Sequence, residues 1–183
     1  MRITKENTAA LFVDFQEKLI PAMDDGAEVV HRSVILLEGL KAMDIPMIFL
    51  RQYPKGLGDI VPEIRAAMGE SRPFDKLAYS AMGDQAIVAE FQKLWVQGIR
   101  NILVCGVESH VCVLQTCIDL TEAGFTALMV TDAVASRRTS DKQIALQRAV
   151  QEVVLLTTVE SILFELCKTA GTDEFKIISK LVK

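Results

Sequence analysis

A cysteine at the start of a predicted helix is the residue of this chain best suited to chemistry. Residues 102–105 (Ile-Leu-Val-Cys) form a short apolar run bounded by Gly106, and residues 111–120 have the apolar face of a helix. Cys112 therefore lies near the first helical turn, where unpaired N–H groups and the helix dipole favour negative charge. The pKa of a thiol in such a place can be lowered into the reactive range. The alternative is a small buried hydrophobic residue, the usual role of a free cysteine.

An acid and a lysine stand at comparable places. Residues 8–15 are a continuous apolar run interrupted by Asp14 near its end, which is typical of a strand buried on both faces of a parallel sheet. Asp14 then lies at the carboxyl end of that strand, where open α/β sheets bind ligands, although it could instead cap a following helix. Lys76 lies in a short extended piece within residues 73–82.

Because the carboxyl ends of parallel strands share one edge of a sheet, we expect Asp14, the loop 51–58, the turn 106–112 and Asp132 to converge. An acid, a lysine and a cysteine in one cleft can perform nucleophilic catalysis. The thiolate attacks a carbonyl carbon, the carboxylate takes and later returns a proton, and the ammonium stabilises both anions. Backbone N–H groups of the turn can stabilise the oxyanion that forms.

The order of predicted elements indicates how these residues are positioned. Apolar runs near residues 8–15, 45–50, 101–105, 127–130 and 153–156 predict strands, and they alternate with amphipathic helical segments. This alternation predicts an α/β fold, a three-layer α-β-α sandwich around a mostly parallel, Rossmann-like sheet of about six strands. No linker or repeat interrupts the chain, so residues 1–183 are predicted to form a single domain.

Composition excludes several classes of function. The 183 residues carry a net charge of −4 and no basic run, which argues against a nucleic-acid partner. The four cysteines have no C-x-x-C spacing and only two histidines accompany them, so a zinc cluster is not expected. The glycine-rich nucleotide-binding motifs are absent, as is the G-x-S-x-G elbow. With no apolar stretch of membrane-spanning length and no signal peptide, we expect a cytoplasmic protein without a membrane partner.

Three motifs together resemble the isochorismatase-like cysteine hydrolase family. Residues 11–16 (Leu-Phe-Val-Asp-Phe-Gln) are similar to the family's V-D-[MF]-Q strand end. Residues 75–82 (Asp-Lys-Leu-Ala-Tyr-Ser-Ala-Met) are similar to its K-x-x-[YF]-S-A-[FM] segment, and residues 106–113 (Gly-Val-Glu-Ser-His-Val-Cys-Val) to its G-x-x-x-x-x-C-V turn. The three occur in family order, and the resemblance covers roughly residues 5–181.

The resemblance implies a catalytic triad of Asp14, Lys76 and Cys112. It also implies a cis peptide bond between Val107 and Glu108, and an oxyanion hole made by the backbone N–H groups of Glu108 and Cys112. A homo-oligomer, dimer or higher, is implied as well, and we expect the apolar C-terminal segment 175–182 to contribute to its contacts.

Departures from the family pattern narrow the expected chemistry. Where nicotinamidases of the family have a metal-binding Asp-x-His motif, this chain has Arg51, Gln52 and Tyr53, so we predict neither a metal nor another cofactor. True isochorismatases cleave a vinyl ether without the cysteine. Because Cys112 is present here, we do not expect that activity. The segments 52–58 and 106–116 are most similar to the isochorismatase domain-containing subgroup.

The leading hypothesis is a metal-independent cysteine hydrolase that acts on a small amide, carbamoyl or related C–N bond through a covalent Cys112 intermediate. The pocket for the small-molecule substrate is predicted to involve Phe15, Gln52, Tyr53, Tyr79 and Val107. The alternative is a catalytically silent member of the family that serves as an oligomeric binding scaffold.

Overall fold

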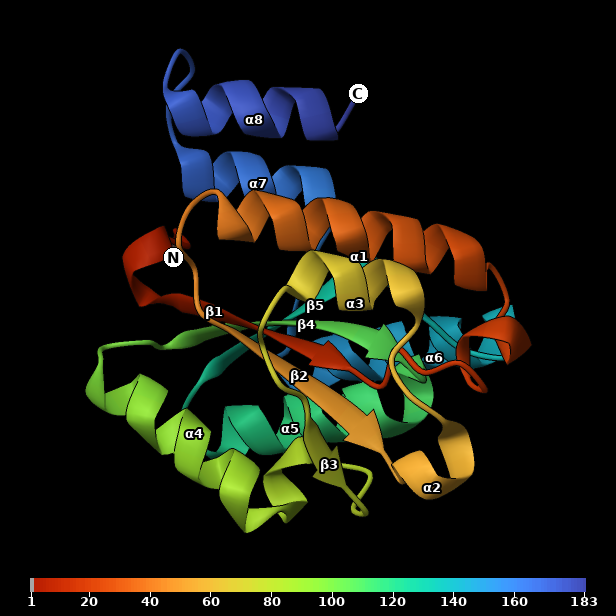
Figure 1. The fold of residues 1–183 in the computed structure, drawn as a ribbon. Coiled ribbons are helices and arrows are strands. Elements are labelled where there is room, and N and C mark those ends of the chain that lie inside the picture. Colours follow the sequence, from red (N-terminus) through yellow and green to blue (C-terminus); the bar gives the residue numbers. More distant parts are fainter. Residues whose placement is uncertain (1) are drawn as a thin grey trace.

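The computed structural model describes residues 2–183, which form a three-layer α/β sandwich (Figure 1). Its six-stranded sheet has the order β3-β2-β1-β4-β5-β6, and every neighbouring pair is parallel. The predicted fold class is confirmed. The strands are β1 (Thr8–Val13), β2 (Met47–Gln52), β3 (Phe74–Lys76), β4 (Asn101–Val107), β5 (Thr126–Ala135) and β6 (Leu155–Thr157).

Helices cover both faces of the sheet (Figure 1). One face carries α1 (Gly26–Lys41), α3 (Pro62–Met68), α7 (Val159–Cys167) and α8 (Asp173–Leu181), and α8 forms the outermost layer over α7 and α1. The other face carries α4 (Gln85–Val96), α5 (Leu114–Glu122) and α6 (Thr139–Gln151). The short helix α2 (Pro54–Leu57) follows the carboxyl end of β2.

The central strands are apolar along their whole length because both of their faces are covered. In β1, Ala10 and Phe12 pack into the core on the α1 side, whereas Ala9, Leu11 and Val13 pack into the core on the α4–α5 side. A strand with two buried faces has no polar alternation, which is why residues 8–13 form a continuous apolar run.

The carboxyl ends of β1 and β4 mark the point where the direction of sheet growth reverses. The chain first adds β2 and β3 on one side of β1, and then places β4 on its other side. Such a switch point leaves a crevice at the strand ends, where open α/β sheets bind ligands. Gly106 pairs with Val13 here at φ +122°, and a Cβ on Gly106 would lie 2.0 Å from the Val13 carbonyl oxygen. Only glycine allows this approach.

One expectation about an individual residue was wrong. Asp132 does not reach the strand-end crevice because β5 continues to Ala135, and its Oδ1 instead accepts a hydrogen bond of 2.8 Å from the Val159 N–H at the start of α7. In the sequence, the polar residues inside β5 resemble the end of a strand.

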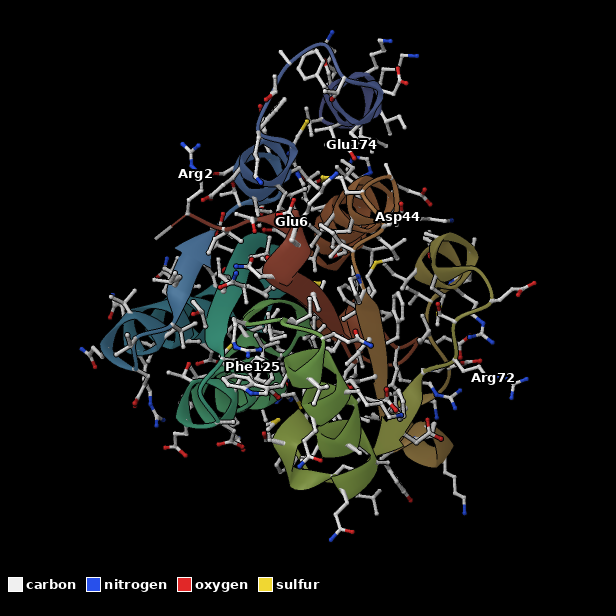
Figure 2. All side chains as sticks on the ribbon, turned by 90° about the vertical axis from the view of Figure 1, so that its left-hand side faces the viewer. Arg2, Glu6, Asp44, Arg72, Phe125 and Glu174 are labelled. Atoms are coloured by element: carbon white, nitrogen blue, oxygen red, sulfur yellow. The ribbon has the colours of Figure 1, made fainter. Side chains whose placement is uncertain are left out.

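The position of Phe125 on the α4–α5 side is visible in Figure 2, and its ring contacts Trp95 edge-on at 5.1 Å between centroids. Trp95 is only partly buried, and the Arg100 guanidinium lies over its ring.

The C-terminal helix is held by both apolar and charged contacts. Lys5 Nζ donates to a Glu174 carboxylate oxygen at 2.6 Å, and Figure 2 shows Glu174 at α8, the helix that lies over α1. Ile178 is buried, whereas Ile177 remains exposed. Among residues 2–183, no helix has the length and apolar character needed to cross a membrane.

Candidate active site

A buried ion pair joins two of the predicted catalytic residues. Lys76 Nζ donates to Asp14 Oδ2 at 2.8 Å, and neither side chain is accessible to solvent. Asp14 follows the last residue of β1 in the left-handed region, at φ +57°, and Lys76 is the last residue of β3. Loss of either partner alone would leave a buried charge without compensation, which costs about 3–5 kcal/mol in proteins.

The Lys76 ammonium has further acceptors, and they are neutral. The side chain of Gln52, from the intervening strand β2, accepts through Oε1 at 2.6 Å. The Tyr79 carbonyl accepts at 3.1 Å, and the Ala78 carbonyl lies at 3.4 Å. Since an ammonium has three N–H donors, Asp14, Gln52 and Tyr79 satisfy all of them and fix its position.

Cys112 lies in a π-helical turn, Ser109–Val113, that leads from β4 into α5. Its side chain is almost entirely buried, at 7 % exposure. Burial first, and then the nearby Asp14 charge, raise the pKa of the thiol to about 12, although Lys76 acts in the opposite direction. The predicted lowering of this pKa was therefore wrong, because the loss of solvation outweighs any help from the helix start.

The Asp14 carboxyl is buried near that thiol. Burial raises the pKa of the Asp14 carboxyl, and the charge and hydrogen bond of Lys76 oppose the rise. Oδ2 faces Lys76, whereas the buried Oδ1 has no conventional hydrogen bond among residues 2–183. Asp14 and Lys76 are thus in direct contact, and Cys112 lies near enough for both charges to influence its thiol.

The turn before Cys112 contains a cis peptide bond between Val107 and Glu108, as the family resemblance implied. The Glu108 carboxylate accepts hydrogen bonds of 3.0 Å from both the backbone N–H and Nε of Arg137, which hold the turn against the end of β5. His110 Nδ1 lies 2.9 Å from Ser136 Oγ. That ring is therefore engaged elsewhere, in agreement with a scheme that needs no histidine. The oxyanion hole at Glu108 and Cys112 remains a prediction.

The lysine segment and the cysteine helix are tied to each other by contacts that the sequence analysis missed. The Ala81 N–H donates to Thr116 Oγ1 at 3.0 Å, and Ser80 Oγ donates to Asp119 Oδ2 at 2.5 Å. Thr116 and Asp119 are three residues apart on α5 and so lie on one face of it. In the sequence, the three-residue spacing of these two polar side chains is the signal that could have predicted the contacts. These contacts give the Ser-Ala pair that follows Lys76 a structural role.

The predicted substrate-binding residues divide into two groups. Phe15 is buried in the core with its ring 6.2 Å from that of Phe12, and Val107 is fully buried. Gln52 donates through Nε2 to the Leu77 carbonyl and accepts from Lys76, so its side chain is already engaged.

Tyr53 and Tyr79, in contrast, are 51 % and 58 % exposed, and both adjoin the Lys76 segment. Tyr53 N–H donates to the Lys76 carbonyl at 2.9 Å. Of the five predicted residues, these two offer accessible side chains near the ion pair. All five assignments to a substrate pocket remain predictions.

A mainly apolar cavity lies apart from this chemistry. Its volume is about 790 Å³, and it is lined by parts of α1 and α3 and by residues 17–23, without Asp14, Lys76 or Cys112. Its lining is mainly apolar and has no nucleophile, so we place the candidate active site at the triad. Among the described residues, no group of three or more His, Cys, Asp or Glu side chains could hold a metal ion.

Comparison with known proteins places these residues in a family context. The family profile described as Isochorismatase domain matches residues 8–161. Isochorismatase domain-containing protein 2 of Danio rerio is 34% identical over 181 residues, which cover 99% of this chain and 89% of that protein.

Two solved structures share the fold. The MAR1 ribonuclease of Caenorhabditis elegans superposes with a TM-score of 0.91 and 34% identity, covering 100% of this chain and 92% of that one. The YcaC gene product of Escherichia coli, described as an octameric hydrolase of unknown specificity, has a TM-score of 0.90 at 23% identity, with 99% and 89% covered. At that identity, the likeness to the octamer concerns the fold alone.

Proposed function

The chain belongs to the isochorismatase family, and from this premise we propose that residues 1–183 are one metal-independent cysteine hydrolase domain. Its reaction is the cleavage of a small amide, carbamoyl or related C–N bond. The observation that carries the proposal is the buried 2.8 Å pair of Asp14 and Lys76, beside a cysteine whose pKa responds to both.

Each group has one role in the proposed reaction. Asp14 takes the proton of Cys112 as the sulfur attacks the carbonyl carbon, and then delivers it to the leaving nitrogen. Lys76 keeps Asp14 ionised and stabilises the thiolate. The N–H groups of Glu108 and Cys112 stabilise the oxyanion. Water then cleaves the acyl-enzyme, with Asp14 as its base, and restores the thiol.

The raised pKa of Cys112 fits this scheme better than a permanently ionised thiolate. With a pKa of about 12, the thiol keeps its proton near neutral pH. The proton must then move during the attack, and Asp14 Oδ1, which has no hydrogen-bond partner among residues 2–183, is available to receive it. This arrangement supports the proposal that the reaction proceeds by proton transfer to Asp14.

A hydrolysis screen over amides, ureides and carbamoyl amino acids, with ammonia release as the readout, tests the proposed activity. For any compound that is cleaved, intact-protein mass spectrometry after rapid acid quenching should show an acyl adduct on Cys112. Turnover that persists in Cys112→Ala would contradict the covalent route. If no compound is cleaved, and Cys112 reacts with electrophiles independently of Asp14 and Lys76, the catalytically silent scaffold is the better account.

The C. elegans relative is named a ribonuclease, so RNA has to be considered as a possible substrate. The present chain has a net charge of −4 and a pI of about 5.3, which disfavour a phosphate-binding surface, so we propose that nucleic acid is not its substrate. Cleavage of a labelled single-stranded RNA that is lost in Cys112→Ala would refute this.

We further propose a homo-oligomer, supported by the octameric relative of the same fold and by the exposed Ile177 on α8. Light scattering at micromolar concentration should give more than the mass of one chain. A monomer at that concentration contradicts the proposal.

A further inference from the structure

Two glutamines form a chain of contacts that ends on the catalytic lysine. Gln16 is fully buried just after β1, and Gln52 is the last residue of β2. Gln16 Oε1 accepts the Gln52 backbone N–H at 2.7 Å, and its Nε2 donates to the Gln52 carbonyl at 3.0 Å and to the Gly58 carbonyl at 2.8 Å. One side-chain amide therefore holds both backbone groups of Gln52.

The side chain of Gln52 connects this held backbone to Lys76. Nε2 donates to the Leu77 carbonyl at 2.8 Å, so Oε1 faces Lys76 Nζ at 2.6 Å. The orientation of both amides is fixed by the network, because only an N–H can meet a carbonyl and only an oxygen can meet an ammonium. Glutamine is thus required at both positions for hydrogen bonding as well as for size.

We infer that Gln16 and Gln52 are positioning residues that set how much of the Lys76 charge is available to Asp14 and Cys112. The inference rests on the proposed function and deepens it. A neutral acceptor holds the ammonium in place without competing for its charge. A carboxylate at position 52 would form a second ion pair with Lys76 and bring another negative charge near the sulfur, which opposes thiolate formation.

The test needs no substrate. The rate at which iodoacetamide modifies Cys112 is measured from pH 7 to pH 10 by peptide mass spectrometry, with circular dichroism as a check on folding. Gln52→Glu keeps the size of the side chain but adds a charge, and should slow the modification at pH 8 at least about tenfold, since one pKa unit is a factor of ten. Gln52→Asn remains neutral but is one methylene too short to reach Lys76, and should slow it only about threefold.

Gln16→Glu loses both donors to the Gln52 and Gly58 carbonyls, so it should slow modification in the same direction. In the double variant Gln16→Glu/Gln52→Asn, Cys112 should be modified no more slowly than in the slower of the two single variants, because both substitutions act through the contact between Gln52 and Lys76. Gln92→Glu and Gln92→Asn, on the exposed face of α4, are the matched controls and should behave as wild type.

Rates for Gln52→Glu within twofold of wild type, or equal slowing by Gln52→Glu and Gln52→Asn, would overturn the inference. If Gln52→Glu does not fold, a Gln52→Asn rate equal to that of Gln92→Asn overturns it instead. Lys76→Met and Asp14→Asn separate this outcome from failure of the proposed function. When neither changes the Cys112 rate, the triad itself fails; when they do and the glutamine variants do not, only the positioning role fails.

Discussion

Replacement of Asp14 by asparagine should make Cys112 more reactive toward a simple electrophile while abolishing turnover. With a pKa of about 12, only about one thiol in ten thousand is ionised at pH 8. The Asp14 charge raises that pKa, and Lys76, freed from its carboxylate partner, would favour the thiolate. A fall of one unit would raise the thiolate fraction tenfold, so we expect at least about a tenfold faster reaction.

The assay is second-order modification of Cys112 by iodoacetamide between pH 7 and pH 10. The wild-type rate should rise about tenfold per pH unit without a plateau in this range, because the thiol stays mostly protonated. Asp75→Asn is the control, since this carboxylate precedes Lys76 but is exposed and pairs with Arg51. A wild-type plateau below pH 8, or an Asp14→Asn rate no faster than wild type, would refute the argument from burial and charge.

Further predictions concern catalysis and stability. Cys112→Ser should fold normally yet lose at least about three orders of magnitude in kcat/KM. The losses of Cys112→Ser and Asp14→Asn should not add in the double variant, because both residues take part in one proton-coupled attack. If Cys112→Ser retained its activity, direct attack by water would have to replace the covalent route. Gly106→Ala should lower the free energy of unfolding by about 3 kcal/mol or more in urea titrations. Gly98→Ala, where φ is also positive (+92°) but the space around the residue is open, should cost only about 1 kcal/mol. Comparable losses in the two glycine variants would contradict the close approach to β1. The free energy of unfolding should also fall as pH rises above 9, because the unfolded thiol ionises near 9.0 and the folded Cys112 thiol near 12. This contribution, up to about 1.4 kcal/mol per pH unit, should be missing in Cys112→Ser.

The sequence was sufficient for the architecture and for the proximity of Asp14 and Lys76. Continuous apolar runs predicted a parallel sheet, and Asp14 was placed at the correct strand end because both faces of β1 are buried. Lys76 was found through a motif, since a three-residue strand such as β3 has too little pattern of its own. Asp132 was misplaced because a polar residue inside β5 looks like the end of a strand.

Properties that depend on neighbours distant in the sequence could not be predicted in the same way. The pKa of Cys112 is set by burial and by residues 98 and 36 positions away, Asp14 and Lys76, so its place near a helix start gave the wrong sign. The amide network of Gln16 and Gln52 was missed for the same reason. The sequence predicts only a substrate-binding role for Gln52, and gives no sign that its side chain also contacts Lys76 and Leu77.

The separation between the enclosed ion pair and the exposed side chains around it has a consequence for evolution. Asp14, Gln52 and Lys76 come from three adjacent strands and have little contact with solvent, whereas Tyr53, Leu77 and Tyr79 are all more than half exposed. Substitutions at such exposed positions usually change stability by less than about 0.5 kcal/mol. A lineage with this fold can therefore explore new substrates at the rim through nearly neutral changes, while the reacting groups are inherited intact.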